Sequence, residues 1–307
     1  MKTPRGISAR QPRSRPRGPA STRDEALFEL WDRLGRYGAA ETDAALKYLI
    51  EWIAARFDAD NVIFCGALRV QSAAAAKCDP FLGWRLRVRR PLRADSAAYR
   101  RQLESYLLRE HYGKLTPTYY RRSHHEQQEA HVGMATRALL SAAGKFRVHR
   151  LRDGWIDLKA FRRSLHYRLY YAEQGIADRI WIGIPVTSRH EAFFLVDRHQ
   201  RPGARRRPFT AEEATCAGHA ARGAMELLRR LFLDHGLLLN AKPFSPRERQ
   251  ILHALLTGRT EKEIAGHAGL KPATLHQYVK GIYGRLQVKS RAELMSLWLD
   301  GSFPGRR

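Results

Sequence analysis

The chain has 307 residues, of which 44% are apolar, and its formal net charge at pH 7 is +25. This length exceeds that of one typical domain, so we expect two folded units and a tail. The excess of Lys and Arg indicates a polyanionic partner. The sequence contains neither an apolar run long enough to span a bilayer nor a signal peptide, so we expect a cytoplasmic protein without a membrane-bound part.

The three cysteines, Cys65, Cys78 and Cys216, are widely spaced and form no C-x-x-C pair. Neither a disulfide framework nor a cysteine zinc site fits this pattern. We therefore expect reduced, mostly packed thiols, and the sequence predicts no cofactor.

Residues 1–23 contain seven basic residues and no acidic residue, set among Pro, Ser and Gly. Such a segment cannot bury enough apolar surface to become ordered, which predicts a disordered basic tail. A loose phosphate-binding arm is the functional alternative. A transit peptide fits less well, because the prolines oppose an amphipathic helix.

Residues 24–57 repeat apolar side chains at helical spacing, which predicts one or two helices at the start of the first domain. Residues 61–70 and 83–91 have the pattern of strands, and the second alternates apolar residues with arginines. This alternation predicts a sheet with one face exposed to water. The remaining expected elements follow in chain order: a polar helical segment, a helix at 158–174, strands at 179–186 and 192–197, a basic loop at 201–208, and a long helix that ends the domain.

This order of elements resembles a GAF-like sensor domain, with PFTAEEA at 208–214 as the entry to the last helix. The resemblance implies an α+β domain over residues 24–240, built from an antiparallel sheet with helices, and a space for a small molecule under the covering loops. Five aromatic residues are candidates to line that space: Trp84, Trp155, Tyr167, Tyr170 and Tyr171. Ordinary core packing is the alternative for aromatics at these spacings.

A group of histidines and glutamates lies at 124–131, where His125 and Glu129 are four residues apart. On a helix this spacing brings both side chains to one face, which a metal site requires. Polar helices often hold such residues by composition alone, so we predict no metal site.

The long helix repeats apolar residues with heptad-like spacing, which predicts a helix that joins two copies of the chain into a homodimer. The expected dimer residues are Ala217, Ala220, Ala224, Leu227 and Leu231. A second apolar stripe beside them leaves open a helix that is buried within a monomer.

From residue 243 to 307 the sequence has three S/T-x-x-E capping boxes, beginning at Ser245, Thr260 and Ser290. Pro272 marks a fourth helix start, since proline suits the first helical position. The expected helices are therefore 246–257, 261–268, 272–286 and 291–300. They form an all-α domain with one small core.

The third of these helices has two different faces. Leu275, Val279, Ile282 and Leu286 recur within one apolar stripe. Gln277, Lys280 and Gly284 fall on the opposite side, because successive residues advance by about 100° around a helix. Two short helices joined by a turn, the second with a polar outer face, are the parts of a helix-turn-helix.

Residues 244–299 closely resemble the LuxR-type (GerE-like) DNA-binding domain. The resemblance depends on SPRER at 245–249, KEIA at 262–265, TLHQYVK at 274–280 and SRAEL at 290–294. It implies that the third helix enters the major groove and that the fourth supports dimerisation. By position it assigns base contacts to His276, Gln277 and Lys280, and phosphate contacts to Lys262, Thr274 and Lys289. Members of the family often carry Lys or Arg where this chain has His276, Gly281 and Gly284.

We therefore expect a dimeric transcriptional regulator that binds double-stranded DNA at specific sequences, with its DNA binding modulated by the N-terminal domain. The autoinducer-binding domain of other LuxR-type regulators competes with the GAF-like interpretation of that domain. Two further classes of protein compete with a regulator: a ligand-processing enzyme domain fused to a DNA reader, and a basic protein that coats nucleic acid. No nucleophile, base and orienting group stand together in the sequence, so we do not expect an enzyme.

Overall fold

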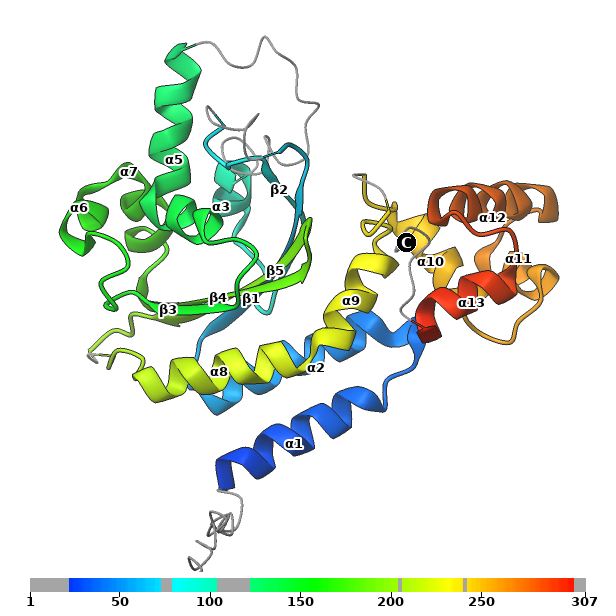
Figure 1. Cartoon of the computed structure of the whole chain (residues 1–307), viewed down its shortest axis with the longest axis horizontal. Coiled ribbons are helices and arrows are strands. Elements are labelled where there is room, and N and C mark those ends of the chain that lie inside the picture. Colours follow the sequence, from blue (N-terminus) through cyan, green and yellow to red (C-terminus); the bar gives the residue numbers. More distant parts are fainter. Residues whose placement is uncertain (1–21, 73–78, 104–121, 204–205, 240–241, 301–307) are drawn as a thin grey trace, which may run out of the picture.

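The structure is a computed structural model, and it describes residues 22–72, 79–103, 122–203, 206–239 and 242–300 (Figure 1). The predicted basic tail therefore lies outside the described residues, apart from its last two. None of the described helices is both long enough and apolar enough to cross a membrane.

The N-terminal part contains a five-stranded antiparallel sheet with the strand order β2-β1-β5-β4-β3. Its strands are β1 (Asn61–Arg69), β2 (Trp84–Pro91), β3 (Arg147–Arg150), β4 (Ile176–Thr187) and β5 (His190–His199). The strands predicted at 61–70, 83–91, 179–186 and 192–197 are all present, whereas the short edge strand β3 was not predicted.

Helices cover both faces of this sheet (Figure 1). One layer contains α1 (Thr22–Gly35), η1 (Ala39–Glu41), α2 (Thr42–Arg56), α8 (Ala211–Gly223) and α9 (Met225–Asp234). The other layer contains α3 (Ala97–Gln102), α5 (Arg122–Ser141), α6 (Leu158–Arg163), α7 (Leu165–Tyr167) and η4 (Arg168–Ala172). Successive residues of a strand point to opposite faces, so the sheet contributes to two separate cores.

The predicted water-exposed face of the sheet is therefore wrong. Two of the β2 arginines that suggested it, Arg85 and Arg89, are paired with carboxylates. Arg85 is almost fully buried and donates from Nη1 to Asp79 Oδ2 at 2.7 Å. Arg89 donates from Nη2 to Asp95 Oδ1 at 3.0 Å. Arginines that alternate with apolar residues suggest a strand face exposed to solvent, but pairing with carboxylates allows such arginines to be buried.

The long helix predicted after residue 210 is broken at Ala224 into α8 and α9. The indole of Trp31 on α1 lies against this break and donates from Nε1 to the carbonyl oxygen of Ala220 at 3.2 Å. A side chain at Gly223 would overlap that indole. After the break, α9 runs at an angle to α8 and extends toward the C-terminal helices (Figure 1).

The C-terminal helices agree closely with the prediction. They are α10 (Pro246–Leu255), α11 (Glu261–Ala268), α12 (Pro272–Leu286) and α13 (Arg291–Asp300). The capping boxes at Ser245 and Thr260 are formed as expected. At the start of α13, the Ser290 hydroxyl accepts from the Glu293 amide, while the Glu293 carboxylate accepts from the amide of Lys289. Gly269 ends α11 in the left-handed conformation, with a φ of 62°.

Candidate functional site

The inner stripe of α12 is fixed by a core that all four C-terminal helices share. Leu275, Val279, Ile282 and Leu286 are each at most 3% exposed. They pack in one cluster with apolar residues of the neighbouring helices: Ile251, Leu252, Leu255, Ile264, Ala265, Leu294, Leu297 and Trp298. Because this stripe is committed to the core, α12 cannot rotate without exposing it.

The opposite face of α12 is open to solvent. Thr274, His276, Gln277 and Lys280 are all exposed, as are Lys262 on α11 and Lys289 after α12. The left-handed residue Gly269 turns the chain between α11 and α12, so the two helices have the arrangement of a helix-turn-helix. The structure thus places the six predicted contact residues on the surface.

The imidazole of His276 lies close to a carboxylate of the same chain. Its Nδ1 lies 3.6 Å from Oε2 of Glu261, the first residue of α11, and both side chains are largely exposed. This contact ties a predicted base-facing side chain to the preceding helix. Sequence reasoning missed Glu261, because the pairing depends on the angle between α11 and α12.

Packing inside the protein does not explain why glycine stands at positions 281 and 284. A Cβ atom built at either residue meets nothing within 4 Å. Elsewhere in the chain, Gly218 and Gly223 lie against ring or methyl carbons that would collide with a side chain. The two glycines of α12 therefore leave its outer face bare at a cost of about 1 kcal/mol each in helix propensity.

A shallow groove runs along this face between α12 and the start of α10. It is lined by Glu248, Ala273, Thr274, Gln277, Tyr278 and Gly281. Glu248 is the acidic group of the groove, but its carboxylate accepts from Arg285 at 3.0 Å and from the amide of Ser245 at 2.6 Å. The acid is thereby neutralised, which suits an anionic partner.

A second candidate site is a cavity of about 170 Å³ between the sheet and the layer formed by α3, α5 and η4. Of the five aromatic candidates, Trp84, Tyr170 and Tyr171 line this cavity. Trp155 and Tyr167 do not line the cavity but pack behind residues that do. Trp155 packs edge-on against the lining residue Trp181, and Tyr167 stacks on Tyr171.

The polar groups of the cavity wall were not predicted. Arg179 donates from Nη2 to Asp197 Oδ2 at 2.7 Å and from Nη1 to the Tyr171 hydroxyl at 2.9 Å. Burial raises the pKa of Tyr99 to about 12, so its hydroxyl stays neutral. Ion pairs thus compensate the buried cations, and the wall is mainly apolar and aromatic.

One donor of this wall lacks an acceptor. Trp84 is 2% exposed, and its indole Nε1 has no hydrogen-bond partner within the described part of the chain. A buried N–H without an acceptor costs free energy that a bound molecule could recover. The cavity therefore suits a small, mostly apolar molecule that carries a hydrogen-bond acceptor.

The structure places the expected dimer residues inside the chain, which corrects that prediction. Ala217, Ala220, Ala224, Leu227 and Leu231 all belong to the core between the sheet and the layer of α1, α2, α8 and α9. None is more than 8% exposed. The spacing that suggested a partner chain reflects packing on the protein's own sheet, which is the alternative that two apolar stripes had left open.

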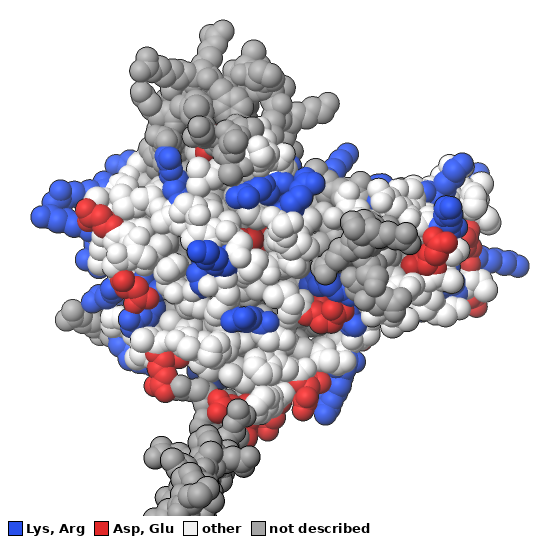
Figure 2. Space-filling model, in the orientation of Figure 1, with Lys and Arg blue, Asp and Glu red and all other residues white. Residues whose placement is uncertain are grey.

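The basic loop at 201–208 is also less available than its sequence suggested. Arg206 is bound by the carboxylates of Asp58 and Asp60. Arg207 pairs with Glu213 at 2.6 Å. On the face shown in Figure 2, Lys and Arg side chains are scattered among acidic ones and do not form a single patch. These contacts weaken the case for a protein that merely coats nucleic acid.

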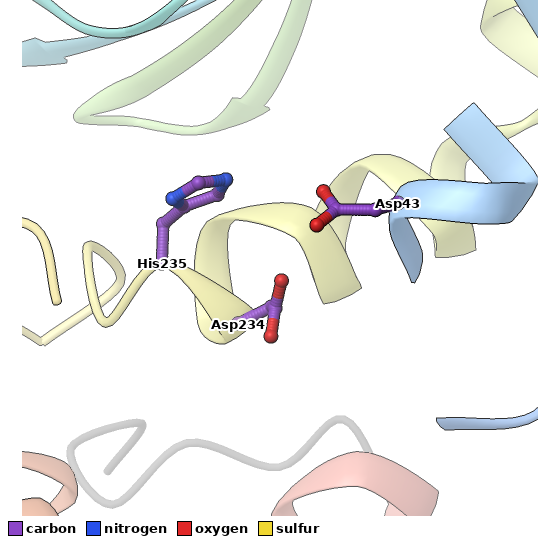
Figure 3. A group of neighbouring side chains, drawn as sticks. All are labelled: Asp43, Asp234 and His235. Atoms are coloured by element: carbon purple, nitrogen blue, oxygen red, sulfur yellow. The ribbon is translucent and has the colours of Figure 1, made fainter. Parts of the chain in front are cut away.

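Within the described part of the chain, Asp43, Asp234 and His235 form a group whose ligand atoms lie within 4.8 Å of one another (Figure 3). The guanidinium of Arg249 donates to both carboxylates and supplies the positive charge that a metal ion would bring. We therefore assign no metal to this group. The histidine-rich cluster at 124–131 has its side chains outside the described residues.

Comparisons with known proteins agree with the C-terminal geometry. Residues 242–298 match the family model of bacterial regulatory proteins of the luxR family. The probable HTH-type transcriptional regulator GfsR of Streptomyces halstedii is 40% identical over 55 residues, which are 18% of this chain and 23% of GfsR. The transcriptional regulatory protein DesR of Bacillus subtilis is 32% identical over 73 residues, which are 24% of this chain and 34% of DesR. The chain thus spans only about a quarter to a third of these curated relatives.

Two solved structures of SdiA align with most of the chain. SdiA in complex with octanoyl-rac-glycerol is 14% identical with a TM-score of 0.43, and the alignment covers 91% of this chain and 95% of SdiA. Escherichia coli SdiA in the space group P6522 is 14% identical with a TM-score of 0.38, and the alignment covers 89% of this chain and 94% of SdiA. These scores are too low to assign the fold of the N-terminal part.

The ion pair between Arg179 and Asp197 in the cavity wall can be tested by its contribution to stability. We expect Asp197→Asn to lower the free energy of unfolding by about 3 to 5 kcal/mol, because Arg179 would stay buried without a countercharge. Urea denaturation of the full chain measures this change. Asp153→Asn is the matched control, since its pair with Arg150 is partly exposed and should contribute less than about 1 kcal/mol. Equal losses in the two variants would contradict the assignment.

Proposed function

We propose that the protein is a sequence-specific DNA-binding transcriptional regulator that works as a homodimer. The observation that carries this proposal is the exposed polar face of α12, held outward by its buried stripe in a unit that matches the luxR family. An α-helix with such a face fits the major groove of DNA, where base edges differ from one another.

The side chains of this face suit base recognition. Gln277 can pair bidentately with adenine N6 and N7, and Lys280 can donate to guanine O6 and N7. His276 completes the proposed base contacts. Lys262, Thr274 and Lys289 surround them at positions where they can bind phosphates, which would fix the register without reading sequence.

The proposed dimer uses α13 rather than α8 and α9. Met295 and Leu299 lie one turn apart on α13 and are 39% and 78% exposed, which is unusual for large apolar side chains in this chain. The resemblance to LuxR-type domains also implies that this helix supports dimerisation. Two copies joined there would present two α12 helices to successive major grooves.

We further propose that residues 24–240 act as a GAF-like sensor domain whose cavity binds a small molecule. The antiparallel sheet covered by helices and the cavity beside Trp84 support this proposal. A cavity of about 170 Å³ is close to the size that accepts a single benzene ring in an engineered protein core. The expected ligand is therefore a compact, largely apolar molecule with one acceptor for the Trp84 N–H.

Base recognition by α12 is testable by substitution. We expect Gln277→Ala to reduce the preference for the bound site over a scrambled one by about 5- to 150-fold, which corresponds to ~1 to 3 kcal/mol. Lys262→Ala should instead weaken binding to both sequences alike and reduce the salt slope by about one. Fluorescence anisotropy at several salt concentrations measures both effects. Gln250→Ala, an exposed glutamine on α10, is the control, and an equal loss there would count against the proposed contact.

The bare end of α12 gives a second test of the proposed interface. Gly284→Ala should raise the free energy of unfolding by roughly 0.5 to 1 kcal/mol, because alanine favours the helix. It should at the same time weaken DNA binding if the missing side chain allows close approach to the phosphates. Gly266→Ala on α11 is the control, since that glycine is equally open and lies outside the proposed contact set. Unchanged DNA affinity in Gly284→Ala would show that the glycine has no role in approach.

The proposed sensor cavity can be probed with two molecules of nearly the same shape. Acetophenone carries a carbonyl acceptor, and α-methylstyrene has a methylene group in its place. We expect acetophenone to raise the melting temperature more, with a stabilisation of about 2.7 kcal/mol at one hundred times its Kd. Trp84→Phe should remove the difference between the probes while keeping the aromatic wall. Melting temperatures that neither probe changes up to its solubility limit would refute the cavity as a ligand site.

A further inference from the structure

A buried ionic junction connects the N-terminal part to the C-terminal helices. Asp234 is the last residue of α9 and is completely buried. Its carboxylate accepts from Arg249 Nε at 3.1 Å and also from Arg249 Nη2 and His253 Nε2, all on α10. Arg249 Nη2 also donates to Asp43 Oδ2 on α2 at 2.9 Å. Two helices of the sensor part thus hold one helix of the DNA-binding part.

The position of Asp234 shows that this acid serves the junction rather than its own helix. A carboxylate at a helix C-terminus is unfavourable, because that end carries the negative pole of the helix dipole. Burial by itself would raise the pKa of Asp234, but His253 and Arg249 outweigh it and lower the pKa overall. Asp234 therefore stays ionised inside the protein because α10 supplies the compensating charge.

His235 lies beside the two carboxylates of the junction. Figure 3 shows the carboxylates of Asp43 and Asp234 between α2 and the end of α9, with the ring of His235 nearby. Burial lowers the pKa of His235 to about 3, so this imidazole is neutral. Within the described part of the chain, the side chains that bond the two carboxylates, Arg249 and His253, both lie on α10.

Further contacts dock the DNA-binding part on α9. The amide of Phe244 donates to the carbonyl oxygen of His235 at 2.9 Å. Arg229 lies within 3.4 Å of the carbonyl oxygens of Leu297 and Trp298 on α13. α9 therefore contacts both α10 and α13, the helix through which we propose dimerisation.

The same helix packs against the strand that forms one wall of the cavity. Cys65 and Ala67 of β1 line the cavity, whereas Gly66 between them faces the other way, toward α9. A Cβ built at Gly66 would lie 3.3 Å from the ring of Phe232. His190 Nε2 lies 2.9 Å from the carbonyl oxygen of Leu237, just beyond α9. One strand thus separates the cavity from the helix that carries Asp234.

We propose that Asp43, Asp234, Arg249 and His253 form a latch that holds the DNA-binding part docked on α9, and that opening this latch releases it. Buried ion pairs suit a switch, because the desolvation of both charges nearly cancels their attraction. Docked and released forms then differ little in free energy.

This inference rests on the proposed function, since the orientation of the C-terminal helices matters for regulation only if they read DNA. In the docked form, the orientation of α13 relative to the sensor part is fixed. In the released form the two α12 helices of a dimer can adjust to the spacing of their half-sites. The latch therefore controls geometry and leaves the base-reading residues unchanged.

Hydrogen exchange of the full-length chain tests the latch. Arg249→Gln removes the guanidinium that bonds Asp234, so we expect exchange to accelerate by about tenfold or more in segments 225–236 and 246–256. Arg247→Gln is the matched control on the same helix, because Arg247 bonds Gln250 and the carbonyl oxygen of Ala268 within the C-terminal part. Unchanged protection of segment 272–286 shows that the C-terminal core stays folded.

A double variant keeps the test decisive. Asp234→Leu combined with Arg249→Leu removes the unpaired buried charge that Arg249→Gln leaves, so protection at the junction should be higher than in Arg249→Gln. Exchange in Arg249→Gln that equals that of the unmodified chain would overturn the latch. DNA binding by the same samples is a separate readout. An unmodified chain without sequence preference would refute the proposed function, while the exchange result would still decide whether the latch exists.

Discussion

The commitment of one face of α12 to a shared core is the constraint from which the functional argument follows. Leu275, Val279, Ile282 and Leu286 are removed from water together with side chains from three neighbouring helices. Because a helix has only one such stripe here, its other face must remain outside, and that face carries Gln277 and Lys280. Burial therefore decides which residues are presented, and their chemistry decides what they can read.

The C-terminal helices were predictable because their signals are local. Ser245 and Thr260 each bond to an amide three residues away, so the sequence within one turn determines where the helix begins. Three of the four helices have the predicted bounds, and α10 ends two residues early. The exposure of the predicted contact residues could also be predicted from the sequence, because it follows from the period of the helix alone.

The N-terminal part was harder to predict because its decisive contacts join residues that are distant in sequence. Arg179 is buried by pairing with Asp197 on the adjacent strand, and no local pattern announces that partner. Trp31 bonds to Ala220, almost two hundred residues further along the chain. Ala220 lies close to the point where the expected long helix breaks. The apolar stripe on α8 and α9 was assigned to a partner chain for the same reason: periodicity shows that a face is buried, but not against what. The Asp234 junction likewise depends on the docking of two domains.

Sequence selection by the full chain is the most direct test of the claim that α12 reads DNA. The unmodified protein would be incubated with a random duplex library at a fixed salt concentration near 0.15 M, and the retained duplexes would be sequenced over successive rounds. The account predicts enrichment of a two-fold symmetric motif whose half-sites lie about 10 base pairs, or a multiple of that spacing, apart. Retention of duplexes without any enriched motif would contradict it, because binding would then come from charge alone.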